Sequence, residues 1–98
     1  VLVGRAEVRR LFFSTRTGTI AGCYVVQGRV VRGAPVRVVR AGEAVYTGPL
    51  TSLRHLKDDV RQMEEGFECG IVLQDFDDFQ EGDMIEVYER EQVARSLS

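Results

Sequence analysis

The sequence predicts an all-β protein, folded as a small closed antiparallel β-barrel of six to eight strands. Short runs of β-branched and apolar residues recur along the chain at spacings of about 8 to 12 residues, and glycine, proline or polar turn signals separate them. Only one short segment has helical character. A closed barrel is favoured over an open sheet because closure removes exposed strand edges.

Length and composition indicate one globular domain. Its 98 residues are 44% hydrophobic and 29% charged, and a chain of this size buries roughly two thirds of its unfolded surface. No apolar run approaches the ~20 residues that a membrane helix needs, and no signal segment is recognisable. Because no signal segment is present and the chain starts at Val1, we expect residues 1–98 to be one domain cut from a longer cytoplasmic protein. We expect this domain to be a monomer and residues 90–98 to be a frayed tail.

The first third of the chain predicts two strands joined by a turn. Residues 4–13 begin with apolar alternation at Ala6 and Val8, which is typical of a strand with one buried face. Residues 14–18 are polar and end in glycine, as turns do. The apolar run at 19–26 is then a strand, in which Gly22 indicates a bulge or a close approach.

The middle of the chain predicts four further short strands, at residues 29–32, 36–40, 44–47 and 50–56. Gln27-Gly28 is expected to turn the chain before the first of them. Ala41-Gly42-Glu43 indicates a hairpin connection. Gly48-Pro49 is expected to separate the last two strands.

Residues 58–65 are the only segment for which we expect a helix, of at most about two turns. Asp58 or Asp59 could cap it, while Val60 and Met63 lie three residues apart on one side. Gly66 is expected to end it.

The remaining chain returns to strand character. Residues 67–73 and 84–89 are predicted strands, separated by an acidic loop and a turn. The loop contains Phe76 and Phe79, which we expect to fold underneath it as apolar plugs.

Charge is distributed unevenly along the chain. Residues 1–57 contain ten Lys or Arg and two Asp or Glu, which gives +8, whereas residues 58–98 contain three and thirteen, which gives −10. Such asymmetry suggests a surface that faces a polyanion, unless the two halves intermix in space and their fields cancel. Twelve of the thirteen basic residues are arginine, the better partner for phosphate and for stacking.

No catalytic or metal-binding set is recognisable. Cys23 and Cys69 are expected to be buried free thiols, because a disulfide is uncommon in the cytosol. Two cysteines and His55 lack the spacing of metal ligands, and no third residue would orient a Cys–His pair. There is no phosphate-binding loop ending in Gly-Lys-Ser/Thr. We therefore expect no enzyme activity, metal or cofactor in this fragment.

Several segments resemble a known family. GTIAG (18–22), GRVVRG (28–33) and VRV (36–38) follow the pattern of the second-domain β-barrel of translational GTPases, and EGDMI (81–85) fits its final turn and strand. The chain from about residue 3 to 89 looks closest to the C-terminal domain of bacterial translation initiation factor two. The segments that point there are GTIAGCYV (18–25), KDDVR (57–61) and EGFECG (65–70).

The resemblance implies non-catalytic binding of the aminoacylated 3′ end of formylmethionyl initiator transfer RNA. It also implies the ribosome as a partner through the parent protein, whose GTPase lies outside this fragment. The binding residues carried over are Cys23, Arg54, His55, Leu56, Lys57, Phe67, Glu68, Cys69 and Gly70. Relatives often have Arg-Tyr-Lys where this chain has His55-Leu56-Lys57, so a stacking aromatic is absent at Leu56.

Each implied role has a structural alternative. Cys23 and Cys69 could form small soft walls for a methionine side chain, or they could belong to the core. Arg54 and Lys57 could neutralise phosphates, or they could belong to a solvated strand face. The whole barrel could instead dock onto a neighbouring domain or the ribosome, or contact transfer RNA without reading the formyl group.

Overall fold

The computed structural model describes residues 1–89 and forms eight strands there, without a helix. The strands are β1 (Leu2–Ser14), β2 (Gly18–Val31), β3 (Pro35–Arg40), β4 (Glu43–His55), β5 (Asp58–Asp59), β6 (Gln62–Glu64), β7 (Glu68–Leu73) and β8 (Met84–Tyr88). Within these residues, nothing has the helical length and hydropathy needed to cross a bilayer. The tail predicted to fray, residues 90–98, lies outside the described residues.

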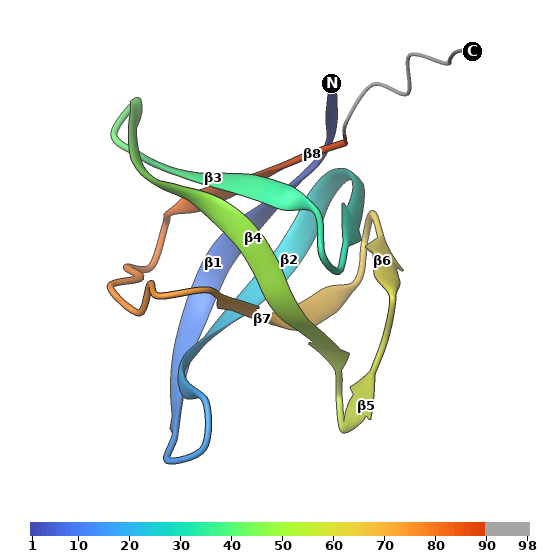
Figure 1. The fold of residues 1–98 in the computed structure, drawn as a ribbon. Helices are drawn as coiled ribbons and strands as arrows, with labels where there is room; N and C mark the ends of the chain where they lie inside the picture. Colours follow the sequence, from blue (N-terminus) through green and yellow to red (C-terminus); the bar gives the residue numbers. More distant parts are fainter. Residues whose placement is uncertain (90–98) are drawn as a thin grey trace, which may run out of the picture.

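Six of the strands pair in a closed ring and form a barrel, whose course can be followed in Figure 1. Going round it, the order is β1, β2, β7, β4, β3, β8 and back to β1, and every pair is antiparallel. The two short strands are additions at the ends of long ones, because β5 pairs with the end of β4 and β6 with the end of β2. The predicted all-β fold and closed antiparallel barrel are therefore confirmed.

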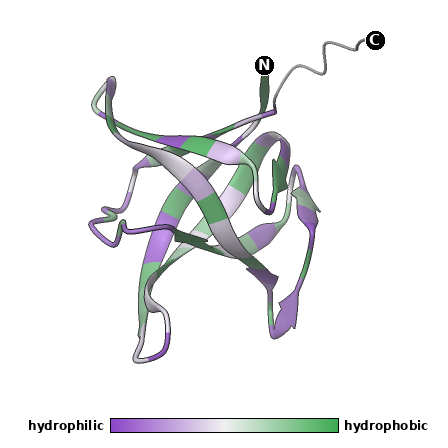
Figure 2. Cartoon of the chain, viewed as in Figure 1, coloured by the Kyte–Doolittle hydropathy of each residue, from purple (hydrophilic) through white to green (hydrophobic). Residues whose placement is uncertain are grey.

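The barrel is filled by the side chains that alternate inward along each strand. On β3 and β8 these are valine and isoleucine, such as Val36, Val38 and Ile85, all of them fully buried. Figure 2 shows the matching alternation of hydrophobic and hydrophilic bands along the ribbon. The period-two pattern of β-branched residues, which predicted these strands, also coincides with their core-facing positions.

Strand β2 corrects the predicted turn at Gln27-Gly28. One continuous strand runs through Gly28, whose φ is 65°. A Cβ atom at Gly28 would lie 2.1 Å from the carbonyl oxygen of Val3. The glycine thus bends the strand where it crosses β1, so that the first half of β2 pairs with β1 and β7 and the last residues pair with β6.

The separation predicted at Gly48-Pro49 is also wrong, because β4 continues through both residues. Pro49 stands opposite Pro35, at the position where β3 begins. Because β3 begins at Pro35, few hydrogen bonds between β3 and β4 are lost at this pair of prolines, and β4 can continue through Pro49. The hairpin predicted at residues 41–43 is confirmed, with positive φ at both Ala41 and Gly42.

The helix predicted at residues 58–65 is wrong. The segment forms β5 and β6 instead, and Met63 pairs with Val30 and is buried against the core. Two turns of helix cannot repay the cost of nucleation in water. Pairing with the free ends of β2 and β4 satisfies the same backbone groups and also buries Met63. Gly66 does mark a turn, with φ of 94°.

The acidic loop is anchored by the two phenylalanines, as predicted. Phe79 is buried in the core cluster and Phe76 packs against it with ring centroids 5.0 Å apart. Phe76 also stacks on Tyr46 at 4.7 Å. At the end of this loop, buried Asp83 accepts hydrogen bonds from Arg40 on β3.

The two oppositely charged halves intermix in space for most of their charges. Six of the seven salt bridges within residues 1–89 join a basic residue of the first 57 to a later carboxylate. Glu86, for example, lies between Arg5 and Arg37. The cations of the described chain without a carboxylate partner are Arg10, Arg16, Arg32, Lys57 and Arg61.

Candidate functional site

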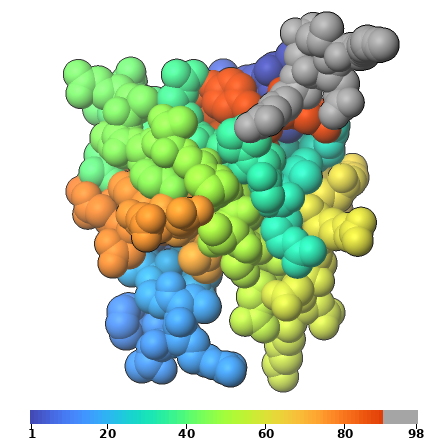
Figure 3. Space-filling model, viewed as in Figure 1, coloured from blue at the N-terminus to red at the C-terminus, as the bar shows by residue number. Residues whose placement is uncertain are grey.

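A cavity of about 600 Å³ lies between the β1–β2 hairpin and the turn that joins β4 to β5. This turn closes a second hairpin, β4–β5. The two hairpins project from the end of the barrel that lies opposite the N-terminus (Figure 1). Figure 3 shows them as two protrusions, blue and yellow-green, with a hollow between them. The cavity is lined by Arg9, Arg10, Phe12, Ile20, Gly22, Cys23, Arg54, His55, Leu56, Glu68, Cys69 and Gly70.

Two glycines make the floor of the cavity. Gly22 on β2 stands directly opposite Gly70 on β7, and both face outward because the residues that follow Gly22 and precede Gly70 face the core. A Cβ at Gly70 would lie 3.2 Å from Cγ2 of Ile20, and one at Gly22 would lie 2.9 Å from the ring of Phe12. The ring of Phe12 takes the space over Gly22, whereas the missing side chain at Gly70 keeps that part of the floor open and lets a ligand approach the backbone.

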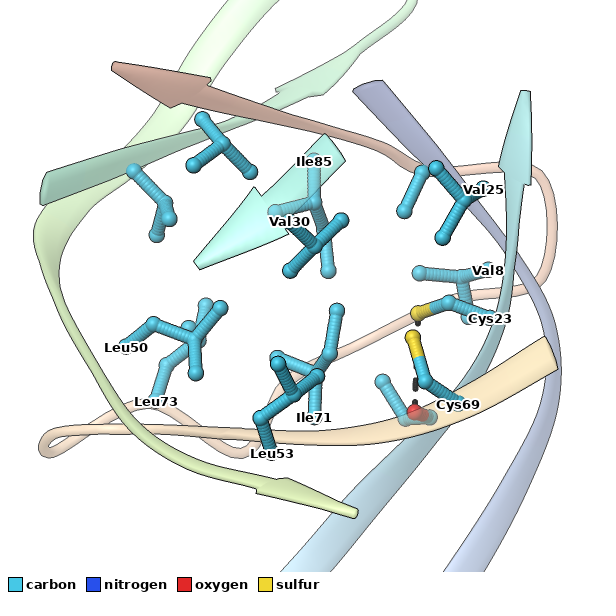
Figure 4. Close-up of a cluster of buried hydrophobic side chains, with 14 of the residues drawn as sticks. Val8, Cys23, Val25, Val30, Leu50, Leu53, Cys69, Ile71, Leu73 and Ile85 are labelled. Carbon is cyan, nitrogen blue, oxygen red and sulfur yellow. Dashed lines mark hydrogen bonds between the residues drawn. The ribbon is translucent and has the colours of Figure 1, made fainter. Parts of the chain in front are cut away.

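Cys23 and Cys69 form the neighbouring cross-strand pair, beneath this floor. Figure 4 shows their sulfur atoms facing each other among the core side chains. Both thiols are free and buried. Burial raises the pKa of Cys69 to about 12 and, aided by Cys69, raises the pKa of Cys23 well above its usual value. At neutral pH both thiols are therefore protonated, which suits a soft apolar wall and not a nucleophile.

The β4–β5 turn builds one wall of the cavity. Leu56 is 86% exposed and has φ of 58°, in the left-handed region that leucine rarely adopts. Arg54 braces the turn by donating from Nη2 to the carbonyl of Lys57 at 2.9 Å, and its Nε lies 3.5 Å from Asp59. A non-glycine residue held in this region costs on the order of 1–3 kcal/mol, and Ala41 and Asp75, outside the cavity, adopt it as well.

His55 is fixed between β4 and β7. Its Nδ1 lies 2.9 Å from the carbonyl oxygen of Glu68, and its ring meets that of Phe67 edge-on at 6.1 Å. A carbonyl oxygen can only accept, so Nδ1 carries the hydrogen of this bond. The other ring nitrogen, Nε2, then remains available to a ligand.

Seven of the nine residues implied by the resemblance line this one cavity. They are Cys23, Arg54, His55, Leu56, Glu68, Cys69 and Gly70. Lys57 and Phe67 do not line it: Lys57 supplies the carbonyl that Arg54 binds, and Phe67 contacts His55 and is half exposed. The residues thus come together, while the role of each in binding stays a prediction.

Sequence reasoning missed the opposite wall. The β1–β2 hairpin contributes Arg9, Arg10, Phe12, Ile20 and Gly22. The available signal was the alternation of Arg10 and Phe12 on one face of a strand. In the hairpin register these two stand opposite Gly22 and Ile20. We predicted a bulge or a close approach at Gly22. The bulge lies on the partner strand, at Arg9, whereas the close approach is confirmed, because a Cβ at Gly22 would lie 2.9 Å from the ring of Phe12.

Most of the charge around the cavity is paired. Three arginines line it against one carboxylate, that of Glu68, but Arg9 and Arg54 lie beside the carboxylates of Glu7 and Asp59. Arg10 is the lining cation without a carboxylate partner in the described chain, and its charge favours an anionic or neutral ligand. Within residues 1–89, no cluster of three or more His, Cys, Asp or Glu side chains is placed to hold a metal ion.

Comparison with known proteins gives one consistent result. The chain is 50% identical over all 98 residues to a segment of translation initiation factor IF-2 from Pelotomaculum thermopropionicum, of which it spans 10%. It is 47% identical over 95 residues to the factor from Geobacillus stearothermophilus and 50% identical over 95 residues to that from Caldanaerobacter subterraneus, and it spans 13% of each. No family model matches the chain.

Proposed function

We propose that this chain, which is homologous along its length to about a tenth of translation initiation factor IF-2, binds the formylmethionyl end of initiator transfer RNA without catalysis. The observation that carries the proposal is the convergence of seven implied residues, from β2, β4, β7 and the β4–β5 turn, on one cavity. Through its parent protein the domain would act on the ribosome in the bacterial cytoplasm, with GTP hydrolysis performed elsewhere in that protein.

The cavity suits the chemistry of this ligand, which combines a thioether side chain, a neutral formyl amide and an adenosine with phosphates. The floor at Gly22 and Gly70, with the protonated thiols beneath, offers an apolar surface for the methionine side chain. Nε2 of His55 and the carboxylate of Glu68 are polar groups at its edge, suited to the formyl amide and the ribose.

Charge supports selection of the formylated form. An unformylated methionyl ester carries an ammonium group, which would be placed beside Arg10 and Arg54 in a site partly removed from water. Like charges about 4 Å apart repel by about 1 kcal/mol even in bulk water, and an unpaired ammonium also loses hydration. The formyl group removes this charge and leaves an amide that can be hydrogen-bonded.

The proposal is tested by the affinities of formylmethionyl, methionyl and uncharged initiator transfer RNA. We expect the formylated form to bind roughly 10- to 100-fold more tightly than the methionyl form, corresponding to about 1.4–2.8 kcal/mol. Fluorescence titration of the 98-residue chain gives the three constants. Equal affinities would favour a barrel that contacts transfer RNA without reading the formyl group.

A purely structural barrel is the rival from another class. The exposed apolar side chains of Leu11 and Phe13 beside the cavity suit a protein surface as well as a nucleic acid. If none of the three transfer RNAs bound, the rival would stand.

A further inference from the structure

The β1–β2 hairpin extends beyond the barrel. Up to Glu7, strand β1 pairs with both β2 and β8, but from Arg10 to Ser14 it pairs with β2 alone. This two-stranded extension exposes 42% of Leu11, 50% of Phe12 and 77% of Phe13. Neighbouring large apolar side chains on a ribbon without a core indicate a surface that a partner covers.

The two faces of the extension differ. Arg10 stands opposite Gly22 and Phe12 opposite Ile20, and these four residues line the cavity. Phe13 stands opposite Thr19, so it points to the other face. The ring of Phe12 lies over Gly22, at the edge of the cavity floor.

Arg10 and Arg9 also differ in what they bind. The Arg9 guanidinium lies 4.3 Å from the centre of the Tyr24 ring, and its Nε lies 3.2 Å from Glu7. Arg10 has no hydrogen-bond or carboxylate partner for its side chain within residues 1–89. Its five donors are therefore available to a ligand at the cavity.

We propose that this hairpin grips the single-stranded RNA next to the terminal nucleotide, with Arg10 on a backbone phosphate and Phe12 stacked on a base. A free arginine beside an exposed aromatic ring is the combination that binds single strands. The charge of Arg10, and of Arg16 at the tip, favours RNA over an apolar protein surface. This inference rests on the proposed function of the same cavity.

The test compares two probes that differ only in length. One is formylmethionyl-adenosine, and the other is a trinucleotide that carries the same formylmethionyl-adenosine at its 3′ end. We expect the wild-type chain to bind the trinucleotide more tightly. Arg10→Ala and Phe12→Ala should each weaken trinucleotide binding about tenfold, a loss typical of one phosphate contact or one stacked base. Because both residues also line the cavity, each variant should weaken binding of formylmethionyl-adenosine too, but by clearly less than it weakens binding of the trinucleotide.

Two control variants match the test variants. Arg32→Ala removes the same charge from an exposed residue just beyond the other end of β2, and Phe13→Ala removes a more exposed ring from the other face of the hairpin. Both should bind the trinucleotide as the wild type does. Arg10→Ala should also flatten the dependence of log affinity on log salt concentration by about 0.7, the value for one phosphate of a single strand. Phe12→Trp should restore stacking.

The outcomes separate this inference from the proposed function. If the wild type fails to bind formylmethionyl-adenosine, the proposed function itself fails. If it binds that probe but gains nothing from the two added nucleotides, or if Arg10→Ala behaves as Arg32→Ala does, the hairpin does not grip RNA. All variants change exposed side chains, so their thermal unfolding should match that of the wild type.

Discussion

Replacing Gly70 by valine is expected to weaken binding of formylmethionyl-adenosine by roughly 10- to 100-fold while the barrel still folds. Gly70 faces outward at the floor of the cavity, and the nearest atom to an added Cβ is Cγ2 of Ile20 at 3.2 Å. The strand can therefore accept a side chain there after a small shift of Ile20. The two methyl groups of valine would occupy the space of the ligand. Calorimetric titration measures the loss, and thermal unfolding checks the fold.

Ser52→Val is the matched control for this change. Ser52 on β4 pairs with Val72, two residues along β7 from Gly70, on the same outward face but outside the cavity. The Ser52→Val substitution adds the same β-branched side chain to the same sheet, but outside the cavity. If Gly70→Val bound the ligand as well as Ser52→Val does, the cavity would not be the binding site.

Replacing Asp83 by alanine is expected to lower the free energy of unfolding by about 2–4 kcal/mol. Asp83 is 2% exposed, and it accepts hydrogen bonds from Nε and Nη2 of Arg40 and from the amide of Gln80, each at 2.9 Å. Truncation leaves three donors without their acceptor at the junction of the acidic loop with β8. Urea unfolding followed by circular dichroism measures the change.

Asp78→Ala serves as the control for charge alone. The Asp78 carboxylate lies 3.7 Å from the same Arg40 but is largely exposed. A surface ion pair of this kind contributes little, so this variant should unfold at nearly the wild-type urea concentration. A similar loss in both variants would mean that general charge balance, and not the buried bond, stabilises the loop.

The contribution of Asp83 also depends on pH. Burial alone would raise its pKa, but hydrogen bonds from Arg40 and Gln80 outweigh burial and leave the folded pKa below the usual value. A carboxyl with a lowered folded pKa stabilises the protein above its unfolded pKa, and that stability is lost as the pH falls through the folded pKa. The wild type should therefore lose its advantage in unfolding free energy over Asp83→Ala as the pH falls from the usual pKa of an aspartate through the lower pKa of folded Asp83.

The local sequence pattern was sufficient to predict the barrel. Every second residue of a strand faces the core, so an alternation of β-branched residues indicates a strand with one buried face. The pattern failed at Gly28 and Pro49, where turn residues lie inside long strands. Gly28 is needed because β2 passes within van der Waals contact of the backbone at Val3, and Pro49 is tolerated opposite Pro35. Both reasons concern another strand, so neither is visible in the local sequence. The helix predicted at residues 58–65 failed for the same reason.

The candidate site was predictable on one side only. The resemblance supplied residues of β2, β4 and β7, which the structure brings together, but it gave no weight to Arg10 or Phe12. These two belong to the site because strand register places them across from Gly22 and Ile20. Pairing between strands is a property of the fold, so a wall made by a neighbouring hairpin escapes motif comparison.

The most direct test is a titration of the 98-residue chain with formylmethionyl-adenosine, in which NMR measures the chemical shifts of the backbone amides. We predict shifts at Gly22, Cys69 and Gly70, and none at Gly33 or Gly48, which line a separate cavity. Methionyl-adenosine at the same concentration should produce much smaller shifts. Equal shifts with both ligands, or shifts confined to Gly33 and Gly48, would contradict a formylmethionyl site between the two hairpins.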